Sequence, residues 1–292
     1  MKIKVYFTKE ITKESVLKMY QVVGKELTGN IAVKVHSGEA GNQNFIKPEM
    51  YEDIINYLNG TIVECNTAYE GERDTTEKHQ KLIENHGWSK HYNVDILDSE
   101  GPDLVLDIPT GKIIKKNYVG KNIKNYDSML VVSHFKGHPM GGYGGALKQL
   151  SIGVSSSKGK RYIHCVGKEN GSYEDMFKVE QTKFLESMAD AAKSVVDYFN
   201  NNIVYINIMK NISVDCDCCA TAKDPCMKDI GILSSTDPVA LDQACIDLVY
   251  NSKDEGKNHL IERIESRKGI HTIKASEKLN IGSREYELIN ID

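Results

Sequence analysis

The first 85 residues repeat one pattern three times, and this pattern constrains the fold more than any other feature of the chain. Short apolar segments with the character of β-strands are each followed by a polar loop and then by an amphipathic helical segment. The strands are expected at residues 2–7, 31–35 and 61–64, and the helices at residues 13–27, 48–58 and 75–85. Successive strand–loop–helix units are typical of parallel sheets. The sequence therefore predicts an α/β protein with a mostly parallel open sheet and helices on both faces.

Between residues 88 and 125 the pattern changes to short alternating pieces separated by Gly-Pro and Thr-Gly turns, which predicts an irregular, β-rich insertion. Other elements are expected as strands at residues 129–132, 203–209 and 286–291, a loop at 155–159, and helices at 173–199, 238–250, 259–267 and 272–279. No internal repeat or low-complexity linker marks a boundary. We therefore expect residues 1–292 to form a single α/β domain that carries this insertion.

The composition is that of an ordinary globular protein, with 40% hydrophobic and 27% charged residues among 292. A net charge of −4 provides no basic surface for nucleic acid. The apolar segments are far shorter than the roughly 20 residues that span a bilayer, so no membrane association is expected. Residues 1–7 resemble a first strand rather than a signal peptide. These features predict a cytoplasmic protein.

Four of the seven cysteines lie within eleven residues: Cys216, Cys218, Cys219 and Cys226. In a reducing compartment, clustered thiols indicate metal or redox chemistry rather than disulfides. The motif Asp-Cys-Asp-Cys at residues 215–218 follows a predicted strand, but its spacing matches neither a zinc ribbon nor a ferredoxin. The alternative, that one or two thiols are functional and the others fill space, stays open.

A second motif follows the predicted strand at residues 129–132, where His134 and His138 precede a glycine-rich segment. Two histidines four residues apart would share one face of a helix and could chelate a metal ion. Pro139 disfavours a helix at His138, so a loop is expected.

The glycines of this segment, Gly144 and Gly145, precede a predicted helix whose first turn contains Lys148. Glycines at the start of a helix let backbone N–H groups approach an anion. Lys136 and Lys148 are candidate contacts for such an anion, and Arg73 suits bidentate binding of a carboxylate or phosphate. The alternative is a flexible surface loop with solvated lysines.

Three stretches together resemble one family, the uncharacterised bacterial proteins named "domain of unknown function 362". The stretches are residues 133–138 with 144–148, residues 66–73 with His79 and residues 86–88, and residues 215–218 with 229–233 and 236–242. Members are often described as iron–sulfur cluster-binding proteins, and many carry an inserted ferredoxin-like module. In this chain, residues 162–167 lead directly to the predicted helix at 173–199, so the ligands of that module are missing. Gln149 also stands where the family pattern has asparagine.

The resemblance implies a metal-binding protein related to iron–sulfur proteins, with a redox or metal-handling role. The candidate cofactors are iron, zinc or an iron–sulfur cluster, and the candidate partners are a small anionic ligand or a separate ferredoxin. The candidate metal ligands are His134, His138, Cys216 and Cys218, and the candidate anion contacts are Lys136, Lys148, Arg73, Gly144 and Gly145. One alternative is a metal-independent enzyme that uses Lys148 and His134 as acid and base on a small carboxylate or phosphate compound. Another is a ligand-binding scaffold without chemistry of its own.

Overall fold

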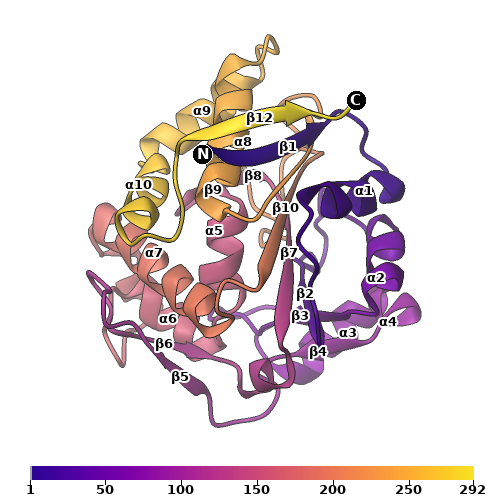
Figure 1. Cartoon of the computed structure of the whole chain (residues 1–292). Coiled ribbons are helices and arrows are strands. Elements are labelled where there is room, and N and C mark those ends of the chain that lie inside the picture. Colours follow the sequence, from indigo (N-terminus) through magenta and orange to yellow (C-terminus); the bar gives the residue numbers. More distant parts are fainter. Residues whose placement is uncertain (1) are drawn as a thin grey trace.

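The three predicted strand–helix units all belong to one eight-stranded sheet in a computed structural model that describes residues 2–292 (Figure 1). The strand order is β12-β1-β11-β10-β7-β2-β3-β4. Five neighbouring strands from β10 to β4 are parallel, and β11 is antiparallel to both of its neighbours. The strands of this sheet are β1 (Ile3–Thr8), β2 (Ile31–Lys34), β3 (Thr61–Glu64), β4 (Val94–Ile96), β7 (Ser128–His134), β10 (Ile203–Met209), β11 (Gly231–Ser235) and β12 (Tyr286–Asn290). The predicted mostly parallel sheet is confirmed.

Helices cover both faces of this sheet (Figure 1). Along β7, Met129 and Val131 join the apolar core on the side of α5 and α7–α10, while Leu130 and Val132 join the core on the side of α1–α4. Because a central parallel strand is buried on both faces, it is apolar throughout rather than alternating. The helices are α1 (Lys13–Val23), η1 (Pro48–Tyr51), α2 (Glu52–Leu58), α3 (Thr76–Asn85), α4 (Trp88–His91), η2 (Lys121–Asn125), α5 (Ala146–Lys148), η3 (Gln149–Gly153), α6 (Ser157–His164), η4 (Glu174–Phe177), α7 (Gln181–Tyr198), α8 (Pro238–Asn251), α9 (Lys257–Ser266) and α10 (Ile270–Lys278).

Two elements differ from the prediction because of local backbone geometry. α1 ends at Val23, not at residue 27, because Gly24 adopts a left-handed conformation (φ 69°) that ends the helix. Residues 155–159 are not a loop, since Ser156 caps α6 by accepting the N–H of Gly159 at 3.1 Å.

The region predicted as a β-rich insertion divides between two sheets. Its strand β4 pairs in parallel with β3 and so extends the main sheet. β5 (Leu104–Asp107) and β6 (Lys116–Val119) form a separate antiparallel pair. The predicted helix at residues 173–199 is also divided, because η4 and α7 are separated by residues 178–180.

β11 was not predicted as a strand, and it determines where the longest loop lies. Because β11 runs antiparallel to its neighbour β10, the connecting residues 210–230 begin and end at the same edge of the sheet. The carboxyl ends of β2, β3 and β7 meet at this edge, which is where open α/β sheets bind ligands.

Candidate functional site

β7 leads directly into a small β-hairpin that carries the predicted histidines and lysines. The hairpin pairs β8 (Lys136–His138) with β9 (Gly142–Gly144). The N–H of Gly137 donates to the carbonyl of Ser213 at 2.8 Å, and a Cβ at Gly137 would lie 2.3 Å from the carbonyl oxygen of Val214. The hairpin is therefore in direct backbone contact with the loop of residues 210–230, and a side chain at Gly137 would push the two apart.

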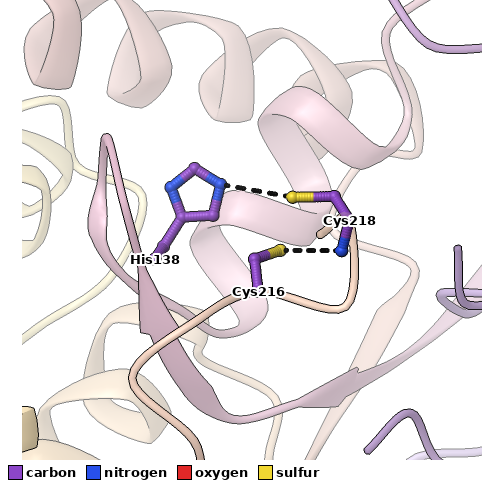
Figure 2. Close-up of side chains that lie close together, drawn as sticks. All are labelled: His138, Cys216 and Cys218. Carbon is purple, nitrogen blue, oxygen red and sulfur yellow. Dashed lines mark hydrogen bonds between the residues drawn. The ribbon is translucent and has the colours of Figure 1, made fainter. Parts of the chain in front are cut away.

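Three of the four predicted metal ligands lie together where the hairpin meets this loop (Figure 2). The ligand atoms of His138, Cys216 and Cys218 are all within 4.8 Å of one another. Nε2 of His138 is 4.0 Å from Sγ of Cys218, and the N–H of Cys218 donates to Sγ of Cys216 at 3.4 Å. Bonds of about 2.0 Å to nitrogen and 2.3 Å to sulfur place the ligand atoms of a tetrahedral ion about 3.5–3.8 Å apart. A contraction of about 1.3 Å or less, with the change at His138 described below, would close this group around an ion.

The side chains of this group are uncharged at neutral pH. Hydrogen bonding with Cys218 and burial raise the pKa of Cys216 to about 11. Burial, aided by the positive charge of Lys148, lowers the pKa of His138 to about 4. Since metal ions bind the thiolate form of cysteine, metal uptake at this group would release protons.

The hydrogen bonds of His138 define its tautomer. Nδ1 accepts the backbone N–H groups of Met140 at 3.2 Å and Gly141 at 2.9 Å. A neutral imidazole whose Nδ1 accepts carries its proton on Nε2, which is the nitrogen that faces Cys218. Coordination of a metal through Nε2 therefore requires the turn at residues 139–141 to release Nδ1, so that the proton can reside there.

His134, the fourth predicted ligand, is held elsewhere. Its Nδ1 contacts both carboxylate oxygens of Asp217 at 2.9 Å, and its Nε2 is 2.6 Å from the carbonyl of Lys210. Both ring nitrogens thus face oxygen atoms of the protein. His134 has no free nitrogen for a metal ion or for acid–base exchange with a ligand unless these contacts break.

Lys136, a predicted anion contact, is also bound to Asp217, at 2.7 Å. Burial alone would raise the pKa of Asp217, but His134 and Lys136 hold it well below its usual range. The charge of Lys136 is therefore used inside the protein. Together these contacts fasten the loop of residues 210–230 to the hairpin and fix the positions of the two cysteines beside Asp217.

Arg73, in the loop that follows β3, stabilises the loop of residues 210–230 through Tyr69. Its Nε pairs with Glu39 at 3.1 Å, and it donates to the Tyr69 hydroxyl at 2.9 Å. The Tyr69 hydroxyl in turn is 3.3 Å from the carbonyl of Cys218. Arg73 is almost fully buried and faces the cavity described below, but its charge is matched by Glu39.

The backbone N–H groups after Gly144 and Gly145, which were predicted to bind an anionic ligand, bind a carboxylate of the protein itself. Asp242 accepts the N–H groups of Ala146 at 2.8 Å and Leu147 at 3.0 Å, the first two residues of α5. A Cβ at Gly145 would lie 2.5 Å from Asp242, so glycine makes room for this carboxylate. Gly144 lies on β9, next to the side chains of Lys136 and Lys148. The N–H groups at the start of α5 are therefore not free for a ligand.

A cavity of about 300 Å³ opens beside the cluster of His138, Cys216 and Cys218, and His138 and Cys218 form part of its wall. The other charged or titratable residues in the wall are Lys34, His36, Glu64, Cys65, Tyr69, Arg73, Lys148, Lys160, His164 and Tyr173. Lys34 forms a buried pair with Glu64 at 2.5 Å. Lys148 and Lys160, by contrast, make no salt bridge with any residue in the range 2–292. The cavity thus has an excess of positive charge.

Residues 31–247, well over half of the chain, match the family described as "Domain of unknown function (DUF362)". The chain belongs to this family. The resemblance inferred from the three motifs is therefore confirmed, and the matched range includes His138, Cys216 and Cys218. None of the curated proteins matches the chain.

The chain is similar to two solved structures. One is the lactate racemase apoprotein from Thermoanaerobacterium thermosaccharolyticum, with a TM-score of 0.49, 13% identity, and coverage of 84% of this chain and 56% of that one. The other is a Thermotoga maritima protein from a structural genomics consortium, with a TM-score of 0.42, 10% identity, and coverage of 93% and 59%. The chain thus spans little more than half the length of either protein.

The sequence motifs did not reveal Lys160 and His164, which both line the cavity. They lie four residues apart on α6, a helix whose first three residues were predicted to belong to a loop. His164 donates from Nδ1 to the carbonyl of Lys160 at 2.7 Å, and burial lowers its pKa to about 4. The sequence signal that could have revealed these two residues is Ser156, a residue type that often caps the start of a helix. A helix that begins there places residues 160 and 164 on one face.

No helix in the described range, residues 2–292, is sufficiently long and apolar to cross a membrane.

Proposed function

We propose that the protein binds one transition-metal ion through His138, Cys216 and Cys218 and presents it to a ligand in the neighbouring cavity. The observation that supports this most directly is the convergence of two thiols and one imidazole within 4.8 Å, with His138 and Cys218 also in the cavity wall. Three protein ligands leave a coordination position for a substrate or water, as in catalytic zinc sites.

The donor set indicates the kind of ion. Thiolate and imidazole ligands together suit zinc, iron, nickel or copper, whereas magnesium and calcium prefer oxygen. A four-iron cluster is normally held by four cysteines. Cys219 and Cys226 lie outside the group, which favours a single ion over a cluster.

Metal content measured after anaerobic purification and reconstitution tests this proposal. We expect near-stoichiometric zinc, iron or nickel in the wild type and its loss in Cys216→Ser and Cys218→Ser. Cys226→Ser is the matched control, because this half-buried cysteine of the same loop lies outside the group and its Sγ hydrogen-bonds to the carbonyl of Ile212 at 3.3 Å. Metal uptake should also release protons, which an indicator dye detects. Retention of metal by a Cys216→Ser/Cys218→Ser double variant, or no binding of any of these ions by the wild type, would refute the proposal.

A second candidate function is a metal-independent enzyme that uses Lys148 and His138 as acid and base on a small carboxylate or phosphate compound. It is favoured by the presence of both side chains in one cavity and by the unpaired charge of Lys148. His134, which the sequence suggested for this role, is bound by Asp217 and Lys210. Activity that survives complete removal of metal by a chelator would favour this candidate, and activity that depends on metal would exclude it.

A further inference from the structure

The residues that line the cavity beside His138 and Cys218 are of two chemical kinds, and this indicates the class of ligand that the cavity binds. The polar part of the wall consists of the lysines and the other polar residues. The apolar part consists of Pro139, Met140 and Ile152, of Met176 and Phe177 on η4, and of Tyr173, which precedes η4.

Two of the positive charges in the polar part, those of Lys148 and Lys160, have no salt-bridge partner among residues 2–292. Lys34 is paired with Glu64 and Arg73 with Glu39, so these four charges balance. Lys160 is 8% exposed, and the hydrogen bond of its Nζ is to the carbonyl of Ser155 at 2.6 Å. Burial lowers the pKa of Lys160, although Asp98 and Glu64 attract it from further away. Buried cations are normally paired, so the arrangement is incomplete without an anion.

Two additional groups in the wall can bind the same anion. Lys148 is half-buried and, within residues 2–292, has no salt-bridge partner. The side-chain nitrogen of Gln149 is buried and has no hydrogen-bond partner in the described part of the chain. Both residues line the cavity together with Lys160, so the wall offers two ammonium groups and one amide donor to an oxyanion.

The apolar part contains two of the most exposed aromatic side chains of the described residues. Phe177 is 60% exposed and Tyr173 is 47% exposed, and their rings meet edge-to-face with centroids 5.1 Å apart. Aromatic side chains stack favourably on a flat apolar group. A cavity of about 300 Å³ is at the small end of the range for ligand pockets, which suits a compound with a single ring.

We infer that the cavity binds an organic anion that has a carboxylate or phosphate group at Lys148 and Lys160 and an aryl-sized apolar body against Tyr173 and Phe177. This inference extends the proposed function, because the ligand would lie beside His138 and Cys218. The lysines and aromatic side chains invoked here are not among the proposed metal ligands, so anion binding can be tested on the metal-free protein.

Calorimetric titration with small probes tests the inference on metal-free and zinc-loaded protein. Phenylacetate and phenyl phosphate carry both features, acetate and inorganic phosphate carry only the charge, and 2-phenylethanol carries only the ring. We expect at least one aryl anion to bind ten-fold or more tightly than its small counterpart, and 2-phenylethanol to bind more weakly still. The preferred head group distinguishes carboxylate from phosphate. Equal affinity for the aryl and small anions, or no anion binding, would overturn the inference.

Variants assign the two halves of the ligand. Lys148→Met should weaken both aryl and small anions by ten-fold or more, with Lys121→Met as an exposed control. Phe177→Ser should weaken the aryl probes alone, with Tyr57→Ser as the control because Tyr57 is 58% exposed and lies on α2. Equal effects of the cavity variants and their controls would contradict the assignment.

Lys160→Met provides a test in which stability and binding change in different directions. Since it removes a buried cation without a salt bridge, the thermal midpoint should not fall, whereas anion binding should weaken by ten-fold or more. Loss of stability with unchanged binding would overturn the role of Lys160. Metal content is measured on the same samples. Aryl-anion binding by a protein that takes up no metal would support this inference and refute the proposed metal-binding function. Metal binding without aryl-anion binding would refute this inference and leave the proposed function standing.

Discussion

The buried pair of Lys34 and Glu64 in the cavity wall allows a quantitative test of the electrostatics. Lys34 is 1% exposed and Glu64 is 3% exposed, and Nζ lies 2.5 Å from Oε2. The other carboxylate oxygen of Glu64 accepts the N–H of Ser37 at 2.7 Å. Lys34→Met removes the cation and leaves a buried carboxylate without its main partner.

The expected cost is about 3–5 kcal/mol, as for the removal of one member of a buried ion pair. An unfolding entropy of about 2.1 cal/mol/K per residue, taken over 292 residues, converts this into a fall of roughly 5–8 °C in the thermal midpoint. Lys13→Met is the matched control, because Lys13 pairs with Glu52 at the surface, where no comparable loss is expected.

The loss should depend on pH. Burial would raise the pKa of Glu64, but Lys34 and neighbouring histidines and Arg73 hold it below its usual range. A depressed pKa contributes stability that is present above the unfolded value of about 4.5 and is lost as the pH falls. In Lys34→Met the pKa of Glu64 rises, so its carboxyl takes up a proton on acidification. The difference in unfolding free energy between wild type and variant should therefore shrink between pH 7 and pH 5.

Chemical denaturation at several pH values measures this difference, and Lys34→Met/Glu64→Gln should recover at least half of the lost stability. The reasoning is refuted if Lys34→Met costs no more than Lys13→Met. It is refuted equally if the double variant is no more stable than the single one.

Three further predictions concern the residues that position the site. Asp242→Asn should lower the free energy of unfolding, measured by urea denaturation, by about 2–3 kcal/mol. The carboxylate accepts one N–H at the start of α5 on each of its two oxygens, whereas an amide has a single accepting oxygen. An unchanged denaturation midpoint would contradict this. Gly137→Ala should lower zinc affinity at least ten-fold by displacing the loop at Val214. Gly101→Ala, whose Cβ would meet no atom within 4 Å, is the control and should not; equal affinities in calorimetry would show the contact at Gly137 to be unimportant. Asp217→Asn should lower the free energy of unfolding by about 3–5 kcal/mol at pH 7, because it breaks a buried ion pair. Since the Asp217 carboxyl has a depressed pKa, this loss should diminish below about pH 4. A loss that does not change with pH would argue against the ion pairs.

Much of the fold could be predicted from local patterns. The strands of the parallel region are apolar and end in polar residues, and α8 begins with the cap Asp237 followed by Pro238. Periodicity could not distinguish β11, a short and fully buried strand, from other apolar segments. The edge strand β4 was assigned to an insertion, because three residues carry little information about which sheet they join.

The residue types of the candidate site could be predicted from the sequence, but the ion pairs that they form could not. His138, Cys216 and Cys218 come together because two motifs follow neighbouring parallel strands, an arrangement that the strand pattern indicates. Which charged residues face a ligand depends on the partners that tertiary structure supplies. Asp217 neutralises Lys136 and holds His134, Glu39 neutralises Arg73, and none of these pairs is close in sequence.

The reversal of β11 explains why the cysteines meet the hairpin at all. A parallel neighbour to β10 would require the chain to leave the carboxyl edge and cross over the sheet. An antiparallel neighbour lets residues 210–230 remain at that edge, where they lie over the carboxyl ends of β7 and β2. A loop of this length needs anchors to hold a fixed shape, and the structure supplies them in Asp217 bound to the hairpin and in Glu39 N–H bonded to the Asp217 carbonyl at 3.0 Å. The buried charges therefore serve to position the two thiols. Lys148 and Lys160, which have no salt-bridge partner in the described residues 2–292, are the charges in the cavity wall that remain for a ligand.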